Sequence, residues 1–166
     1  MTQTNILTLH LDADSQAHFD AMRQAHYPAA LNQIAAHLTL FHTLPDQPGI
    51  NDLLEQLTAT HTDFTLRVTG LRSLGRGVAY TLASPDLLAL HKELAAAFAS
   101  DLTAQDKQRF QPHIVVQNKV TPERARTLLT NLQHDFQALE VRAEGLHLWH
   151  YLNGPWKLAK NFSFRS

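Results

Sequence analysis

Residues 36–42 read Ala-His-Leu-Thr-Leu-Phe-His, an alternation of polar and apolar side chains that predicts a short β-strand. Successive side chains of a strand point to opposite faces, so Leu38 and Leu40 share one face and His37 and Thr39 share the other. We expect the apolar pair to face helices in the core. The imidazole and the hydroxyl then lie together on the opposite face of the strand.

A second stretch has the same character. Residues 112–120, Pro-His-Ile-Val-Val-Gln-Asn-Lys-Val, predict a β-branched strand whose isoleucine and second valine turn inward. On this strand His113, Val115 and Gln117 share the other face. Almost half of the 166-residue chain separates the two histidines. Their separation suggests that the same structural unit occurs twice.

The order of the expected strands and helices around the two motifs also repeats, although residue identity between the halves is poor. Ser84-Pro85 and Thr121-Pro122 each combine a capping hydroxyl with a first-turn proline, which predicts two helix starts. Strands are expected at 6–11, 36–42, 64–71, 77–83, 112–120, 139–152 and 156–164, and helices from about 13 to 27, 51 to 60, 85 to 98 and 122 to 136. We therefore expect a single domain over residues 1–166, built from pseudo-repeat lobes of roughly 1–75 and 76–166.

The composition excludes several classes of protein. Fourteen basic and 15 acidic side chains make the net charge −1, unlike a protein that binds duplex DNA. The absence of cysteine excludes disulfides, thiolate metal sites and cysteine nucleophiles. The chain has neither a signal-like start nor an apolar run of about 18 residues. We expect a cytoplasmic protein that does not bind membranes, with a monomer as the default state.

The 11 histidines are the main source of chemistry near neutral pH. If a rough two-fold axis relates the halves, His37 and His113 oppose each other across a cleft. A neutral imidazole removes a proton from an attacking hydroxyl or water, and a protonated one delivers a proton to the departing oxygen. The Thr39 hydroxyl can donate to a phosphate oxygen. This chemistry requires no metal or other cofactor, and it leaves open which histidine is the base.

His37-Leu-Thr-Leu and His113-Ile-Val-Val resemble the paired H-x-[ST]-hydrophobic motifs of the two-histidine (2H) phosphoesterase superfamily, in its 2′-5′ RNA ligase-like branch. The resemblance covers the whole chain. It implies an α+β fold that is bilobed and pseudo-two-fold, with two antiparallel sheets flanked by helices around a central cleft. It also implies a hydrolase that takes part in RNA processing. The expected activity is that of a metal-independent phosphodiesterase acting on 2′,3′-cyclic phosphates or on 2′-5′ linked nucleotides or RNA ends. His37 and His113 would be the acid–base pair and Thr39 a phosphate ligand.

The second motif departs from the family pattern, because Val115 stands where threonine or serine is usual. Valine has nearly the shape of threonine but cannot donate a hydrogen bond, and a missing transition-state donor costs a few kcal/mol. Gln117, on the same strand face, is a candidate replacement donor. The alternative function is a non-catalytic protein that binds nucleotides or RNA ends through a degenerate site.

Aromatic residues near the end of the chain suggest a place for a base. Trp149 and Tyr151 share a strand face with His147 and are candidates to stack on a nucleobase. Tyr80 and Trp156 are interpreted as core. His147 and His150 lie on opposite strand faces, so we expect no metal site there.

Overall fold

The structure is a computed structural model that describes residues 4–166. Seven strands, four α-helices and two short 3-10 helices follow one another within this range. In chain order they are β1 (Thr4–Leu11), α1 (Ala13–His26), η1 (Ala29–Leu31), β2 (Thr39–Pro45), α2 (Ile50–Ala59), β3 (Phe64–Ser73), β4 (Val78–Ala83), α3 (Pro85–Ala97), η2 (Ala99–Asp101), β5 (His113–Gln117), α4 (Pro122–His134), β6 (Leu139–Tyr151) and β7 (Trp156–Ser163).

Helix starts agree with the capping chemistry of the sequence. The Ser84 hydroxyl accepts a hydrogen bond from the Leu87 N–H at 3.2 Å, and the Thr121 hydroxyl accepts one from Arg124 at 3.3 Å. Proline follows each cap in the first turn, where the missing N–H costs nothing. The Asp12 carboxylate caps α1 in the same way. These starts are local features, which explains why the sequence predicts them.

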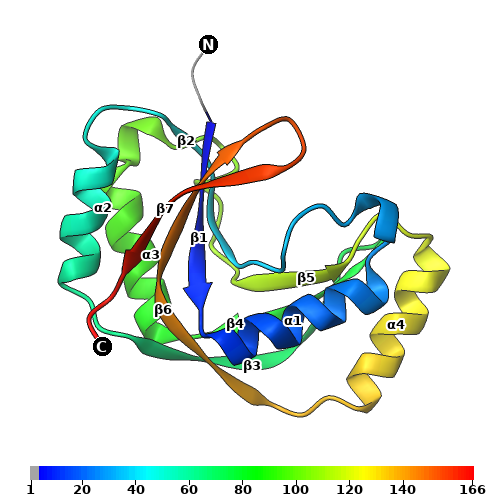
Figure 1. The fold of residues 1–166 in the computed structure, drawn as a ribbon. Coiled ribbons are helices and arrows are strands. Elements are labelled where there is room, and N and C mark those ends of the chain that lie inside the picture. Colours follow the sequence, from blue (N-terminus) through cyan, green and yellow to red (C-terminus); the bar gives the residue numbers. More distant parts are fainter. Residues whose placement is uncertain (1–3) are drawn as a thin grey trace.

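All strand pairs are antiparallel and belong to one sheet, in the order β2-β1-β6-β3-β4-β5 with β7 beside β6. The 13-residue strand β6 joins the sheet together, because β1 pairs along one edge while β3 and then β7 pair along the other. The α+β class is confirmed. The expected division into two sheets is not confirmed, since β6 runs unbroken through both groups of strands (Figure 1).

The two sequence halves are interleaved. Strand β1, which has β2 on its other edge, pairs with β6 from the second half, while β3 from the first half pairs with β4. Helix α1 packs on β5 and α4 on β3 and β4, whereas α2 packs on β7. In Figure 1, α2 and α3 lie on one side of the molecule and α1 and α4 on the other. Fully buried Phe19, Phe41 and Phe98 are among the largest core side chains.

Strand boundaries near the two motifs differ from the expected ones. Strand β2 begins at Thr39, so His37 lies just before the strand rather than inside it, and β5 is shorter than expected with His113 as its first residue. Each histidine therefore follows an irregular segment, one after α1 and the other after α3. Within residues 4–166, no helix is long and apolar enough to cross a bilayer.

Candidate active site

The two motif histidines have the same local geometry. The His37 Nδ1 atom lies 2.8 Å from the Ala35 carbonyl oxygen, and the His113 Nδ1 atom lies 2.7 Å from the Gln111 carbonyl oxygen. A carbonyl oxygen only accepts, so each Nδ1 carries the hydrogen. In the neutral ring Nε2 therefore keeps its lone pair, and this is the nitrogen that can accept or deliver a proton at a ligand.

The surroundings of His37 keep its ring neutral. Burial lowers the pKa of His37 to about 4, while the hydrogen bond to Ala35 opposes this shift. The positive charges of Arg23, His42 and His113 lower this pKa further. Thr39 of the first motif and His113 of the second line one cavity, so the two motifs approach each other although their strands lie at opposite ends of the sheet order.

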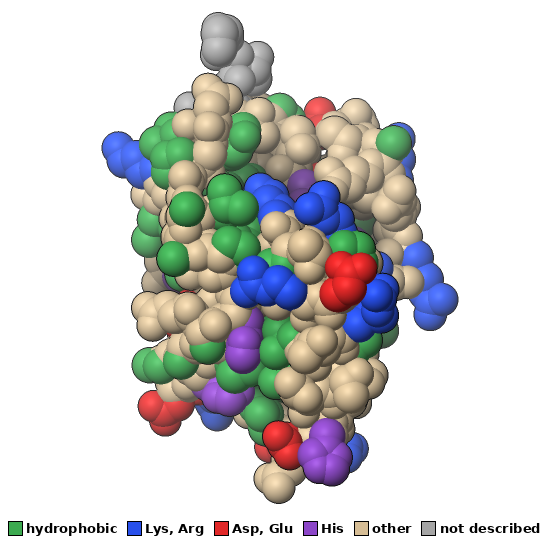
Figure 2. All heavy atoms as spheres, turned by 90° about the vertical axis from the view of Figure 1, so that its right-hand side faces the viewer, with side chains coloured by type: hydrophobic (Ala, Val, Ile, Leu, Met, Phe, Trp, Pro, Cys, Tyr) green, Lys and Arg blue, Asp and Glu red, His purple; other side chains and the backbone are tan. Residues whose placement is uncertain are grey.

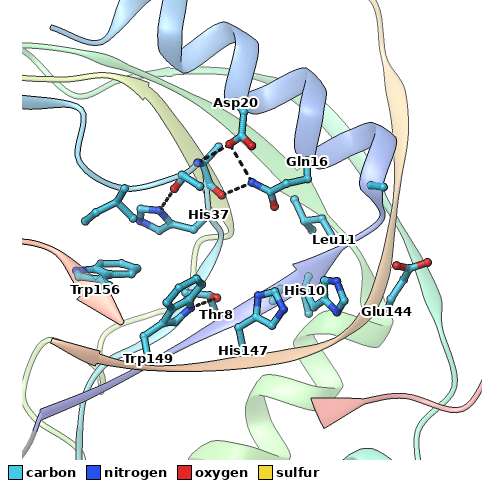
Figure 3. A pocket seen from close by; sticks show the side chains of 15 residues that line it. Thr8, His10, Leu11, Gln16, Asp20, His37, Glu144, His147, Trp149 and Trp156 are labelled. Carbon is cyan, nitrogen blue, oxygen red and sulfur yellow. Dashed lines mark hydrogen bonds between the residues drawn. The ribbon is translucent and has the colours of Figure 1, made fainter. Parts of the chain in front are cut away.

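Helix α1 holds the backbone in front of His37. The Asp20 carboxylate accepts hydrogen bonds from the Ala36 N–H at 2.8 Å and from Gln16 Nε2 at 3.0 Å. Gln16 Nε2 also donates to the Ala36 carbonyl oxygen at 2.7 Å (Figure 3). Both polar groups of Ala36 are thus bound by one turn of helix, which fixes the direction in which the His37 side chain leaves the backbone.

An aromatic cavity of about 270 Å³ lies beside His37. Trp149 and Trp156 form part of its wall, and the Trp156 ring centroid is 4.6 Å from that of His37 (Figure 3). The Trp149 indole N–H donates to the Thr8 hydroxyl at 2.9 Å, which holds this ring in place. The flat aromatic faces make the cavity suited to a planar ligand.

A stacked histidine pair lines the same cavity. The rings of His10 and His147 lie 4.2 Å apart between centroids at an interplanar angle of 25° (Figure 3). Burial, with a smaller contribution from His10, lowers the pKa of His147 to about 4. His10 Nδ1 is buried without a hydrogen-bond partner among residues 4–166. His150 points elsewhere, to the Asn5 side chain at 2.8 Å, so His147 and His150 do not meet.

A polar cavity of about 260 Å³ brings Thr39 and His113 together. His42 lines it as well and is held by Asp106, whose carboxylate accepts from the His42 N–H at 2.8 Å, His42 Nδ1 at 3.1 Å and the Thr43 N–H at 2.9 Å. Burial raises the pKa of Asp106, but these hydrogen bonds outweigh it and keep the pKa below its usual value. The segment before His113 is thereby fastened to β2.

The three residues expected to contact the substrate, apart from the motif residues, lie in three separate places. Trp149 lines the aromatic cavity, as expected for a stacking residue. Gln117 does not reach the polar cavity: a register shift between β4 and β5 pairs it with Val78, and it is buried beside a separate cavity near α1 and α4. Tyr151 is exposed at the end of β6, outside both cavities.

Other residues at the two cavities are not found by reading the sequence. Trp156 is expected in the core but lines the aromatic cavity, while Tyr80 is buried against Phe19 as expected. Strand alternation predicts that His42 faces away from His37, yet irregular pairing of β1 with β2 lets it face the polar cavity. Arg72 and Arg109 also line that cavity. Isolated arginines carry no local signal that distinguishes them from solvated ones.

The α+β fold carries two histidine motifs from distant parts of the chain, and in each motif the histidine Nδ1 contacts the carbonyl oxygen two residues earlier. A sequence profile of the 2′-5′ RNA ligase superfamily matches residues 11–155. The chain belongs to this family, and the expected resemblance is confirmed. A search of curated proteins finds no match.

Solved structures share the fold at low sequence identity. TT0787 of Thermus thermophilus is 19% identical with a TM-score of 0.70, and the match covers 98% of each chain. E. coli LigT complexed with 3′-AMP is 18% identical with a TM-score of 0.62, over 100% of each chain. A structure described as a phosphoesterase is 18% identical with a TM-score of 0.64, again over 100% of each chain. These neighbours show that the chain shares their fold, while the family supports a phosphoesterase or 2′-5′ RNA ligase-like enzyme.

Proposed function

We propose that the protein is a metal-independent phosphodiesterase that acts on 2′,3′-cyclic phosphates or 2′-5′ linkages of nucleotides and RNA ends. The observation that carries this proposal is the matched pair of imidazoles. His37 and His113 each donate Nδ1–H to a backbone carbonyl two residues earlier, and each is left with Nε2 for chemistry. Thr39 lines the same cavity as His113, where its hydroxyl can donate to a phosphate oxygen.

The proposed hydrolysis of a cyclic phosphate assigns one proton to each ring. His37, neutral because its pKa is lowered to about 4, is the base. As a water oxygen bonds to phosphorus, His37 Nε2 takes a proton from that water. The bond from phosphorus to one ribose oxygen breaks with its electron pair on the oxygen, and protonated His113 Nε2 delivers a proton there. The product is a phosphomonoester with a free hydroxyl, and exchange with solvent restores both rings.

The aromatic cavity suits the base of the substrate. Trp149 and Trp156 flank His37, and stacking of a base on an aromatic side chain is worth about 1–3 kcal/mol. LigT has been crystallised with 3′-AMP, NADP+ and ATP, which supports a nucleotide as the ligand of this chain too. Although the net charge is −1, Lys and Arg side chains gather on the face turned to the viewer in Figure 2. A basic face favours a polyanionic ligand.

The test compares His37→Ala, His113→Ala and the exposed control His18→Ala on a 2′,3′-cyclic nucleotide and a 2′-5′ linked dinucleotide. Loss of a general acid or base lowers kcat by about 10²–10⁴-fold, so both motif variants should lose turnover while the control keeps it. The wild-type rate should be unchanged by EDTA. Full activity in both motif variants would refute the proposal.

Val115 favours a second candidate, a nucleotide-binding protein without turnover. The second motif has no side-chain hydroxyl at this position, so its share of phosphate stabilisation is reduced. Binding of a 3′-nucleotide without turnover of any cyclic phosphate or 2′-5′ linkage would support this candidate over the enzyme.

A further inference from the structure

We infer that Arg72 is a catalytic residue that provides a phosphate-stabilising hydrogen-bond donor in place of the hydroxyl missing from the second motif at Val115. This inference rests on the proposed function, and it identifies a group that no motif contains. Arg72 lies on the face of the sheet that carries His113.

Strand register places Arg72 in the same row as Val115. Arg72 pairs with Ala79 of β4, and Ala79 pairs with Val115 of β5. In the next row, Gly70 pairs with Thr81, which pairs with His113. Residues paired across antiparallel strands project from the same face of the sheet. Only the methyl group of Ala79 therefore stands between the Arg72 and Val115 side chains on this face.

A β-bulge is responsible for this orientation. Val68 pairs with Leu82 but Gly70 pairs with Thr81, so one extra residue of β3 is accommodated between these two pairs. Without this shift, Arg72 would lie opposite Val78 on the core side and Leu71 would face His113's side of the sheet. With it, Leu71 packs against the core and Arg72 lines the polar cavity. Bulges commonly redirect a side chain next to a functional site.

The charges around the polar cavity favour an anion. Arg72 and Arg109 line the cavity together with Thr39 and His113, and neither guanidinium makes a hydrogen bond or ion pair within residues 4–166. Among its described lining residues the one carboxylate is Asp106, which three N–H contacts already occupy. An unpaired guanidinium in the same cavity as His113 can bind two phosphate oxygens at once.

Arg72 is a better candidate than Arg109 for the missing donor. Arg109 lies in the irregular segment between η2 and β5, whereas Arg72 stands on a strand whose register is set by pairing on both sides of β4. Preorganised donors on rigid elements stabilise developing charge without reorganisation. Arg109 is then expected to contribute to substrate attraction more than to the chemical step.

The experiment compares Arg72→Gln with Arg67→Gln, which changes an exposed arginine on the same face of β3 outside the polar cavity. On a 2′,3′-cyclic nucleotide, Arg72→Gln should lower kcat about 10²-fold with a smaller change in KM, by comparison with loss of an oxyanion-hole donor. Arg67→Gln should leave kcat within about twofold. Both glutamine variants should unfold at the wild-type urea concentration, because neither guanidinium has a hydrogen-bond or ion-pair partner among residues 4–166.

Rescue distinguishes this role from a general effect of charge. Val115→Thr restores a hydroxyl at nearly constant shape, so it should raise kcat at least tenfold in the Arg72→Gln background and less than threefold in the wild type. Equal activities of Arg72→Gln and Arg67→Gln would overturn the inference. A loss in Arg72→Gln that Val115→Thr does not restore would overturn it as well, since Arg72 would not then replace the missing donor.

A binding measurement separates failure of this inference from failure of the proposed function. If the protein turns over none of the substrates, the enzymatic proposal falls, but inorganic phosphate binding can still be followed by calorimetry. Arg72→Gln should weaken phosphate binding about tenfold relative to Arg67→Gln. Equal phosphate affinity of the two variants would refute a phosphate-binding role for Arg72 whether or not the protein is an enzyme.

Discussion

Replacement of His147 by glutamine should reduce the acid sensitivity of the fold. His147 stacks on His10 in the aromatic cavity, and burial lowers its pKa to about 4. In the unfolded chain its pKa returns to about 6.5. The unfolded state therefore binds more protons at intermediate pH, and folding stability must fall as pH falls from about 6.5 to about 4.

The size of this effect follows from the two pKa values. At pH 5 an imidazole with a pKa of 6.5 is almost fully protonated, whereas one with a pKa of about 4 is about one-tenth protonated. The difference lowers the free energy of unfolding by about 2 kcal/mol relative to pH 7, where the ring is mostly neutral in both states. His37, whose pKa is also lowered to about 4, adds a similar loss.

The assay is urea unfolding at pH 7 and pH 5, followed by far-UV circular dichroism. Between these pH values His147→Gln should lose about 2 kcal/mol less than the wild type. The control His18→Gln changes an exposed residue of α1 and should lose as much as the wild type. Carboxylates with lowered pKa values, such as Asp12 and Asp106, affect all three proteins alike. Equal losses in His147→Gln and the wild type would refute the reasoning that burial keeps this ring neutral.

Two further predictions concern packing and anchoring. Gly77→Ala should lower the free energy of unfolding by about 3 kcal/mol, because the added Cβ would lie 2.0 Å from the Gln117 carbonyl oxygen. The control is Gly70→Ala, whose Cβ would lie 3.7 Å from the Thr81 hydroxyl oxygen. It should lower the free energy of unfolding by less than about 1 kcal/mol in the same urea experiment. Asp106→Asn should lower the free energy of unfolding by about 1–3 kcal/mol in urea and also lower kcat. An amide cannot accept all three contacts, two from His42 and one from the Thr43 N–H, that join β2 to the segment before His113. Unchanged stability and turnover would contradict this anchoring role.

Much of the local structure could be predicted from the sequence. The order of strands and helices is expected nearly as observed, because apolar periodicity and the caps at Ser84 and Thr121 act within a few residues. The pairing of the strands is harder to predict from the sequence. Nothing in residues 139–151 indicates that β6 will pair with β1 on one edge and with both β3 and β7 on the other.

Some residues of the candidate site could likewise be predicted from the sequence, and others could not. His37, Thr39 and His113 stand out by their motifs; Thr39 and His113 line the polar cavity, and His37 lines the aromatic one. Strict alternation assigns Gln117 to the His113 face, and the irregular register of β5 against β4 turns it away. Arg72 carries no signal in the sequence and reaches the polar cavity through the bulge in β3.

The sequence by itself thus determined the elements, the two histidine motifs and the family. The tertiary structure decided which side chains join the motifs at the two cavities. The physical reason is that side chains alternate with a period of two, so a shift of one residue in pairing moves a side chain to the opposite face. Such shifts depend on contacts between strands far apart in the chain, and local sequence patterns do not contain them.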